Sequence, residues 1–277
     1  MIAPDVTERS LAELVSLSDR VSIVTGGAAG IGLAIAQRLA EAGSSVVIAD
    51  LQQSTVDAVA QSLSRSFGVS ALGVATDIRV ESQVVALMER TVSTFGRIDV
   101  LVNNAAVYPL KPALELSVDE WDAVQSLNVR GVFVASREAA RRMIPAARGG
   151  VIINIASISG FRGRPKMGAY VTSKHGVVGL TRSLAAEWGP EGIRVLGIAP
   201  LLVATPGMAE WQKSGAAQPD DAGNGAEAIQ KIVTAHLPLG RIGVPDDIAR
   251  VALFCASDMS CMMTGSTLAV DAGVMCC

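Results

Sequence analysis

The sequence predicts an α/β fold: one Rossmann-type, doubly wound domain with a seven-stranded parallel sheet and helices on both faces. Half of the 277 residues are hydrophobic but only 4% are aromatic, which suits aliphatic strands buried on both faces between Ala-rich helices. Short β-branched runs alternate with longer helical periods along the whole chain, as in a parallel sheet wrapped on both sides. A Gly-rich turn also joins the first strand to the first long helix, where doubly wound folds bind ligands.

Seven short apolar runs are the expected strands. They are VSIVTGG (21–27), SSVVIAD (44–50), SALGVATD (70–77), DVLVNNA (99–105), GVIINIAS (150–157), IRVLGIAP (193–200) and STLAVD (266–271). Helical periodicity between them predicts helices over Ile31–Ala42, Ser54–Phe67, Val80–Phe95, Val118–Ala147, Tyr170–Glu187 and Pro245–Ala256.

No break in composition suggests a second domain, so residues 1–277 are expected to form one unit with an N-terminal extension over 1–18. The small, polar stretch KSGAAQPDDAGNGA (213–226) is flanked by apolar residues such as Met208 and Trp211. We expect the surrounding segment, 207–236, to be a substrate lid rather than a linker.

Charge and composition argue against several classes of partner. The net charge is −3 and Lys and Arg form no cluster, so no nucleic-acid partner is expected. No apolar run approaches the roughly 20 residues of a spanning helix, and the N-terminus has no basic-then-apolar leader. We therefore expect a cytoplasmic protein with no membrane partner.

The sequence contains few residues that could bind a metal. Only His175 and His236 are present, and the four cysteines lack paired ligand spacing. Cys276 and Cys277 at the terminus permit a metal site or a strained disulfide, but reduced thiols suit a cytoplasmic chain better. No metal is expected.

The turn TGGAAGIG (25–32) has the features of a phosphate-binding turn. Gly26, Gly30 and Gly32 let the backbone turn sharply and approach a pyrophosphate, which then faces the N–H groups and positive dipole end of the next helix. The alternative is an ordinary Gly-rich turn. Asp50 at the end of the second strand makes the dinucleotide interpretation stronger.

Asp50 also predicts which dinucleotide binds. A carboxylate there accepts hydrogen bonds from the adenosine ribose and repels a 2′-phosphate, while Ala29 and Leu51 offer that phosphate no cation. NAD is therefore the expected cofactor. Asp77, with Ile78, ends the third strand and either caps the adenine or forms a turn.

Tyr170 and Lys174 suggest acid/base chemistry. Their i, i+4 spacing places them on one helix face, where an ammonium favours the phenolate and is expected to lower the pKa of the tyrosine. Such a tyrosine takes a proton from an alcohol or gives one to a carbonyl. A surface pair on a helix is the alternative, but Ser157 ends the preceding strand and its loop leads into Tyr170.

Together these motifs resemble the classical short-chain dehydrogenases/reductases. The resemblance runs from about Asp19 to Gly273 and rests on TGGAAGIG, NNAA (103–106), Asn128, Ser157, YVTSK (170–174) and the ending RIGVPDDIARVALFCASD…TGSTLAVDAG (241–273). It implies that Tyr170 is the acid/base, that Ser157 binds the substrate oxygen and that Lys174 holds the nicotinamide ribose and tunes Tyr170. It implies further that Asn128 supports a water in the proton relay. The expected cofactor-binding residues are Gly26, Ala29, Gly30, Ile31, Gly32, Asp50, Leu51, Asp77, Ile78, Asn104, Ala105, Tyr170, Lys174, Pro200, Val203 and Thr205.

Three positions depart from the family pattern without removing a catalytic group. Leu201 follows Pro200 where the family often has Gly, Ala106 stands where NNAG is commoner, and Ala272 gives VDAG where VDGG is usual. The side chain of Leu201 is expected to change the turn near the nicotinamide.

Substrate recognition is expected from segments 106–111, 159–167 and 207–236. Arg162, Arg164 and Lys166 either read an anionic substrate group through an Arg fork or form a solvated loop or subunit contact. The candidate substrate residues are Tyr108, Ser159, Arg162, Arg164, Met208 and Trp211.

The expected function is NAD(H)-dependent interconversion of a secondary alcohol (alcohol, polyol, sugar or cyclic alcohol) and its ketone. The alternatives are a 3-oxoacyl-thioester reductase, which more often uses NADPH, and a non-catalytic NAD-binding sensor or structural subunit. The resemblance also implies a homotetramer paired through the long helices and last strands.

Overall fold

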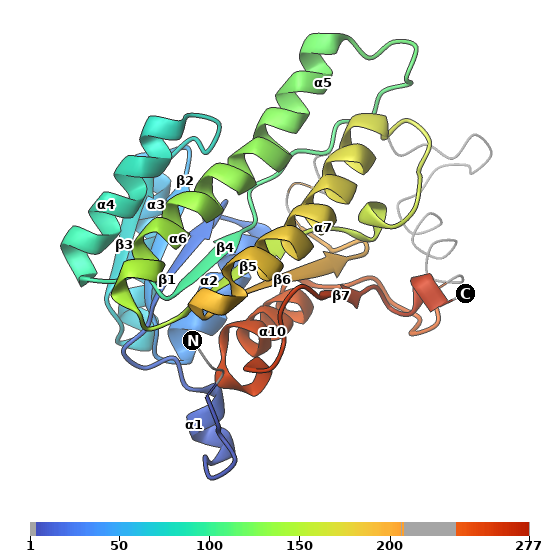
Figure 1. Cartoon of the computed structure of the whole chain (residues 1–277). Helices are drawn as coiled ribbons and strands as arrows, with labels where there is room; N and C mark the ends of the chain where they lie inside the picture. Colours follow the sequence, from blue (N-terminus) through green and yellow to red (C-terminus); the bar gives the residue numbers. More distant parts are fainter. Residues whose placement is uncertain (1–3, 206, 208–236, 277) are drawn as a thin grey trace.

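A seven-stranded parallel sheet forms the centre of the molecule (Figure 1), in a computed structural model that describes residues 4–205, 207 and 237–276. The strand order is β3-β2-β1-β4-β5-β6-β7, and every neighbouring pair is parallel. The strands are β1 (Val21–Thr25), β2 (Ser45–Asp50), β3 (Ala71–Ala75), β4 (Val100–Asn103), β5 (Gly150–Ile155), β6 (Ile193–Pro200) and β7 (Thr267–Val270). The predicted Rossmann-type topology is confirmed, and the order reverses between β1 and β4, where such sheets open a ligand crevice.

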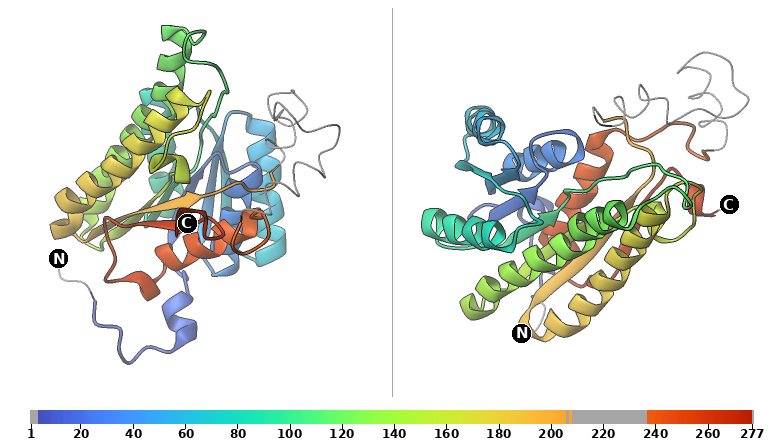
Figure 2. Two further views of the ribbon diagram at one scale, coloured as in Figure 1. Left: turned by 90° about the vertical axis from the view of Figure 1, so that its right-hand side faces the viewer. Right: turned by 90° about the horizontal axis from the view of Figure 1, so that it is seen from above.

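Two hydrophobic cores cover the two faces of the sheet, and Figure 2 shows the helices on either side of it. One core joins the sheet to α2 (Gly30–Glu41), α3 (Gln53–Phe67) and α10 (Pro245–Ala256). The other joins it to α4 (Glu81–Phe95), α6 (Val132–Ala146) and α7 (Gly168–Trp188). The central strands β1 and β4 are buried at every residue, which explains why their sequences are continuous apolar runs rather than alternating ones.

The predicted helix over 118–147 is interrupted. It begins as α5 (Val118–Gln125), passes through a π-helical turn at Ser126–Gly131 and continues as α6. At the turn, a Cβ on Gly131 would lie 3.0 Å from the Ile78 side chain, so a glycine allows close approach. Such π-turns within helices are frequent at functional sites, and this one carries Asn128. The other predicted helices agree with the structure to within two residues at each end.

Polar contacts attach the two ends of the chain to the body. The short helix α1 (Leu11–Val15) has a capping box made by Ser10 and Glu13, and Arg9 and Arg20 both pair with Asp258. These contacts hold the predicted N-terminal extension beside the end of α10.

Arg194 of β6 fixes the same C-terminal end of α10. Its guanidinium donates to the carbonyls of Cys255, Ser257 and Ser260 at 2.9–3.1 Å. A cation among carbonyls at a helix C-terminus is a favourable arrangement, so β6 and the C-terminal segment are joined by one largely buried side chain.

No helix among the described residues is long and apolar enough to cross a membrane. Within the same residues, no group of three or more His, Cys, Asp and Glu side chains is placed to hold a metal ion. Cys255 and Cys261 are free thiols, and Cys277 lies outside the described residues.

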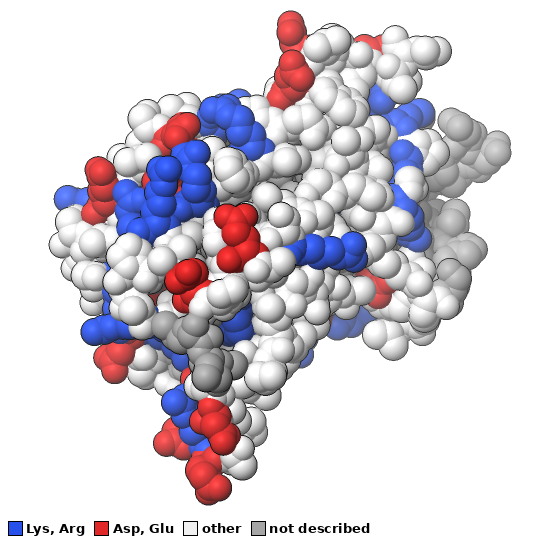
Figure 3. All heavy atoms as spheres, viewed as in Figure 1, with Lys and Arg blue, Asp and Glu red and all other residues white. Residues whose placement is uncertain are grey.

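Charged side chains are unevenly spread over the face that carries α6 and α7. Figure 3 shows Lys and Arg gathered on the side of α4 and α6, where Glu138 pairs with Arg137, Arg141 and Arg142. The first half of α7 carries few charges in this view.

Candidate active site

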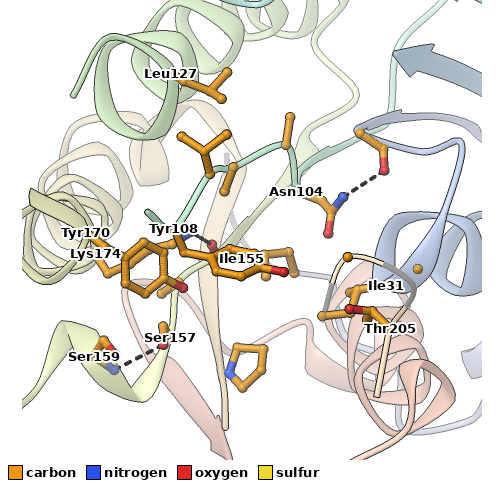
Figure 4. A pocket seen from close by; sticks show the side chains of 18 of the residues that line it. Ile31, Asn104, Tyr108, Leu127, Ile155, Ser157, Ser159, Tyr170, Lys174 and Thr205 are labelled. Atoms are coloured by element: carbon orange, nitrogen blue, oxygen red, sulfur yellow. Dashed lines mark hydrogen bonds between the residues drawn. The ribbon is translucent and has the colours of Figure 1, made fainter. Parts of the chain in front are cut away.

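A cavity of about 900 Å³ opens at the carboxyl ends of the strands, where β1 and β4 diverge. Its walls come from the residues that follow β1, β2, β3, β4, β5 and β6, together with the start of α7. In Figure 4, Tyr170, Lys174 and Ser157 lie on one side of it and Ile31, Asn104 and Thr205 on the other, with Tyr108 and Ile155 between them. The topology thus brings sequence motifs that are far apart to one place.

The Gly-rich turn forms one wall of this cavity and has no room for side chains. A Cβ on Gly32 would lie 2.1 Å from the Gly26 carbonyl oxygen, and one on Gly26 would lie 2.9 Å from Cα of Ala105. Gly26 and Gly30 also have positive φ angles of 61° and 54°, which favour glycine. The Asn104 amide donates to the carbonyls of Thr25 and Gly26 at 3.0 and 2.9 Å and so fixes the turn against β4.

The turn presents a surface that fits a dinucleotide pyrophosphate. The N-cap of α2 is Ala29, which offers the first N–H groups of the helix no side-chain acceptor. Those N–H groups and the positive end of the helix dipole therefore remain for an anion. Ala29, Gly30 and Ile31 all line the cavity.

Asp50 stands where a ribose would bind, at the end of β2. Its carboxylate accepts from the Ala28 N–H at 3.1 Å and from the Leu51 N–H at 2.8 Å. These two bonds hold the carboxylate at the cavity edge, which both Asp50 and Leu51 line. The residues present fit an adenosine ribose here.

Asp77 both forms a turn and lines the cavity. It accepts from the Arg79 N–H at 2.9 Å and pairs with the Arg79 guanidinium at 2.6 Å, which holds the pKa of Asp77 below its usual value. The turn predicted for Asp77 is confirmed, whereas the adenine cap stays a prediction. Arg79, which the sequence analysis did not single out, is a cation at the same end of the cavity.

Tyr170 is in contact with Ser157 and Tyr108. Burial raises the pKa of Tyr170, whereas its hydrogen bond with Ser157 and the charge of Arg164 lower that pKa. The Tyr108 ring meets the Tyr170 ring edge-on, with centroids 6.1 Å apart. Ser157 also accepts from the Ser159 N–H at 3.1 Å, so its Oγ is fixed between the two elements.

Lys174 lies one turn after Tyr170, with Nζ 5.7 Å from the centre of the tyrosine ring. Its ammonium donates to the Ile155 carbonyl at 2.7 Å, and burial lowers its pKa to about 8. The expected lowering of the Tyr170 pKa by Lys174 is not what this structure gives. Desolvation of the phenol outweighs it, and the groups that favour the phenolate are Ser157 and Arg164.

Asn128 does not line the cavity but supports a segment that does. From the π-turn, its side chain exchanges two hydrogen bonds with the Val107 backbone, and its Nδ2 also donates to Ser173 Oγ at 3.0 Å. Ser173 in turn donates to the Tyr170 carbonyl at 2.7 Å. Asn128 therefore ties the segment after β4 to the helix of Tyr170.

The three departures from the family pattern have clear structural settings. Ala106 and Leu201 line the cavity, and the Leu201 N–H donates to Val270 of β7 at 3.2 Å. Ala272 has a φ of 55°, a left-handed conformation in which a glycine is less strained.

Most predicted site residues meet at the cavity. Those that line it are Gly26, Ala29, Gly30, Ile31, Asp50, Leu51, Asp77, Ile78, Asn104, Ala105, Tyr108, Ser157, Ser159, Arg164, Tyr170, Lys174, Pro200, Val203 and Thr205. Gly32 acts through packing, and the structure does not bring Arg162 to the cavity. Met208 and Trp211, with the lid predicted over 207–236 except Gly207, lie outside the described residues. Lining residues not predicted individually include Thr76, Arg79, Leu127 and Leu202.

Comparison with known proteins agrees with this geometry. A family model described as enoyl-(acyl carrier protein) reductase matches residues 26–275. The chain is 38% identical to D-threitol dehydrogenase of Mycolicibacterium smegmatis, over 93% of both chains. It is 39% identical to cis-4-hydroxycyclohexanecarboxylate dehydrogenase of Sinomonas cyclohexanicum, over 93% of this chain and 97% of the other.

Solved structures give the same result. A gluconate 5-dehydrogenase from Burkholderia cenocepacia, crystallised with NADP and tartrate, superposes with a TM-score of 0.87 at 32% identity, over 97% of this chain and all of the other. Sequence motifs, strand order and site geometry agree with both kinds of comparison. The chain is an oxidoreductase and belongs to the classical short-chain dehydrogenase/reductase family.

Proposed function

We propose that this enzyme interconverts a secondary alcohol and its ketone with NAD(H), using Tyr170 as the acid/base. The observation that carries the proposal is the contact of Tyr170 with Ser157 inside a cavity that also holds a dinucleotide-type Gly turn. Two hydroxyl groups that meet at a cavity wall suit binding of one substrate oxygen. The substrate class is an alcohol, polyol, sugar or cyclic alcohol.

The roles of the side chains follow from their positions. When bound, the nicotinamide supplies the hydride donor or acceptor. Ser157 holds the substrate oxygen by hydrogen bonding, and Tyr170 Oη takes the alcohol proton during oxidation or donates one to the carbonyl during reduction. Lys174, with its ammonium near the tyrosine ring and bonded to Ile155, would hold the nicotinamide ribose, as the family resemblance implies. Asn128 positions these side chains, and the family resemblance implies that it also supports a water in the proton relay.

NAD rather than NADP is the proposed cofactor, because Asp50 holds a carboxylate at the ribose end of the cavity. A 2′-phosphate there would meet a like charge. Arg79 is a cation at the same end, but its charge is compensated by Asp77. The NADP bound to the gluconate 5-dehydrogenase is a property of that protein.

A panel of substrates with one substitution tests the function. The full chain is incubated with NAD⁺ or NADP⁺ and secondary alcohols, polyols and sugar acids, and with NADH and acetoacetyl thioesters, while absorbance of the reduced cofactor is followed. We expect NAD⁺-dependent oxidation of at least one alcohol and a loss of about 10²–10⁴-fold in kcat for Tyr170→Phe. Tyr108→Phe, which keeps the edge-on ring contact, shows separately whether the second tyrosine hydroxyl at this wall contributes to substrate binding.

Three outcomes would contradict the proposal. Full turnover by Tyr170→Phe would remove the acid/base role. Tight NADH binding without turnover of any alcohol would favour the non-catalytic sensor, and turnover of thioesters alone would favour the 3-oxoacyl-thioester reductase.

We also propose that the chain is one domain and assembles as a homotetramer. Exposed apolar side chains on and near the long helices and the last strand, among them Val118, Phe133 and Met262, support such pairing. Light scattering should give about 114 kDa, four chains of 28.6 kDa. A monomer mass at micromolar concentration would rule the tetramer out. Cytoplasmic location remains a prediction from the sequence.

A further inference from the structure

Charges of opposite sign occupy opposite ends of the cavity. The carboxylates among its described lining residues are Asp50 and Asp77, which follow β2 and β3. The lining cations near Tyr170 are Arg164, Lys166 and Lys174. Lys174 is bonded to Ile155, so Arg164 and Lys166 are the lining cations near Tyr170 that remain for a ligand.

A tight turn holds the backbone of Arg164 at this wall. The Met167 N–H donates to the Arg164 carbonyl at 3.4 Å, with Pro165 between them and Lys166 at a φ of 60°. Proline followed by a positive φ is the pattern of a type II turn, and the third position normally favours glycine. The Lys166 carbonyl also accepts from the Lys111 N–H at 2.7 Å, which ties the turn to the segment after β4.

Within the part of the chain that the structure describes, the Arg164 guanidinium has no carboxylate partner. The charge of Arg164 is felt by Tyr170, so the guanidinium lies near the tyrosine although Arg164 is exposed to solvent. A cation that lines a cavity and has no carboxylate partner is a binding group for an anion.

We propose that Arg164 binds a carboxylate of the substrate, so that this enzyme prefers small hydroxy acids and oxo acids to neutral alcohols. The inference rests on the proposed function, because it assumes that the carbinol carbon lies at Tyr170 and Ser157. A planar guanidinium binds a carboxylate through two parallel hydrogen bonds, which fixes the orientation of the substrate as well as its affinity. The names of relatives do not decide this point, since threitol is neutral and hydroxycyclohexanecarboxylate is an acid.

Arg162 provides the matched control. It lies two residues earlier in the same loop and is exposed like Arg164, but it does not line the cavity. Arg164→Ala and Arg162→Ala therefore remove the same charge from the same loop, one inside the cavity and one outside it. Arg164→Lys keeps the charge and loses the bidentate geometry.

The test measures binding and turnover separately. Binding of cyclohexanecarboxylate and of its neutral isostere cyclohexanecarboxamide is measured by calorimetry at saturating NADH. Turnover is measured for cis-4-hydroxycyclohexanecarboxylate against cis-4-methylcyclohexanol, and for gluconate against glucitol and glucitol 6-phosphate. Acid and neutral substrates are compared at one pH, because removing the Arg164 charge also changes the pKa of Tyr170 and affects both alike.

We expect the native enzyme to favour acid over neutral partner by at least about tenfold, as charged hydrogen bonds typically give. Arg164→Ala should abolish this preference for the acid, mainly by raising the KM of the acid substrate. Arg164→Lys should keep part of the preference, and Arg162→Ala should leave it unchanged. Equal acid preference in Arg164→Ala and the native enzyme, or no preference in the native enzyme, would overturn the inference. A preference for glucitol 6-phosphate over gluconate would assign the site to phosphate instead. If no alcohol is oxidised but the acid still binds through Arg164, the proposed function fails and the anion site stands.

Discussion

Asn128 makes a pair of reciprocal hydrogen bonds to the backbone of Val107: its Oδ1 accepts from the Val107 N–H at 3.0 Å, and its Nδ2 donates to the Val107 carbonyl at 2.8 Å. The amide thus pairs with the chain after β4 much as a neighbouring strand would. Tyr108, the next residue, is held edge-on to the Tyr170 ring. The π-turn places this amide where a regular helix would not, so the irregular backbone is what positions Asn128 to support the site.

Asn128→Ala should therefore lower both stability and activity. The substitution removes three hydrogen bonds, two with the Val107 backbone and one with Ser173, which costs about 2–3 kcal/mol. We expect kcat/KM to fall more than the affinity for NADH, because the Gly turn is untouched. Urea unfolding and steady-state kinetics measure the two effects, with Asn128→Asp retaining the acceptor but not the donor. Unchanged kcat/KM in the alanine variant would show that the segment after β4 needs no such support.

Asp50→Asn should weaken the discrimination against NADP. Ala28 and Leu51 donate to different oxygens of Asp50, so the variant keeps an acceptor for one of these N–H groups and removes the charge that opposes a 2′-phosphate. We expect the ratio of kcat/KM for NAD⁺ over NADP⁺ to fall by about tenfold or more. Gln52→Ala, at the neighbouring solvent-exposed position, is the control. A native enzyme that already prefers NADP⁺ would contradict the cofactor proposal.

Lys174→Met should stabilise the cofactor-free protein at neutral pH. Burial lowers the pKa of Lys174 from 10.5 to about 8, so below pH 8 the folded state must hold a charge that the unfolded state carries without penalty. That cost is relieved as pH rises from 8 to 10.5, where only the unfolded state keeps the proton. We expect a gain of about 2 kcal/mol at pH 7, after allowing for the lost bond to Ile155, and a smaller gain at pH 10.

Urea unfolding at the two pH values checks the Lys174 prediction, while activity should be lost at both. Lys111→Met is a suitable comparison, because that lysine is half-exposed and makes a surface ion pair with Glu120, of small energetic value. The same change in stability at pH 7 and pH 10 for Lys174→Met would refute the account.

Ala272→Gly should stabilise the protein, although it removes a methyl group. Ala272 has a φ of 55°, which strains any residue with a Cβ by about 1–2 kcal/mol. Part of the relief is offset by the greater freedom of glycine in the unfolded chain, which leaves about 0.5–1 kcal/mol. Ala269→Gly, within β7 nearby, should instead destabilise. Thermal unfolding compares the two variants, and a lower Tm for Ala272→Gly would contradict the prediction.

The sequence was sufficient for the sheet and for the two ends of the cavity. Strand runs and helical periods predicted the topology, because burial on both faces of the sheet leaves a clear apolar pattern in the sequence. The site could be predicted because Gly26, Asp50, Ser157 and Tyr170 follow strand ends that a parallel sheet must bring together. Predicting that these residues meet required only the order of the strands.

Features that depend on packing were not visible in the sequence. Residues 118–147 have continuous helical periodicity, so the π-turn at Asn128 could not be distinguished from a regular helix. Arg162 and Arg164 are equivalent by residue type and loop position, and only the turn around Pro165 decides which one lines the cavity. The sign of the Tyr170 pKa shift was also missed, because spacing to Lys174 says nothing about how much water the phenol loses.

The bonds from Arg194 to the end of α10 have a consequence for how far the chain can be shortened. The Arg194 guanidinium donates hydrogen bonds to three carbonyls that lie more than 60 residues later in the sequence. A protein that ended before α10 would keep a largely buried cation with no acceptor, and such an uncompensated charge costs several kcal/mol, a large share of the stability of an ordinary domain. The catalytic residues all precede residue 205, yet we expect no active fragment to be obtained by deleting the C-terminal segment.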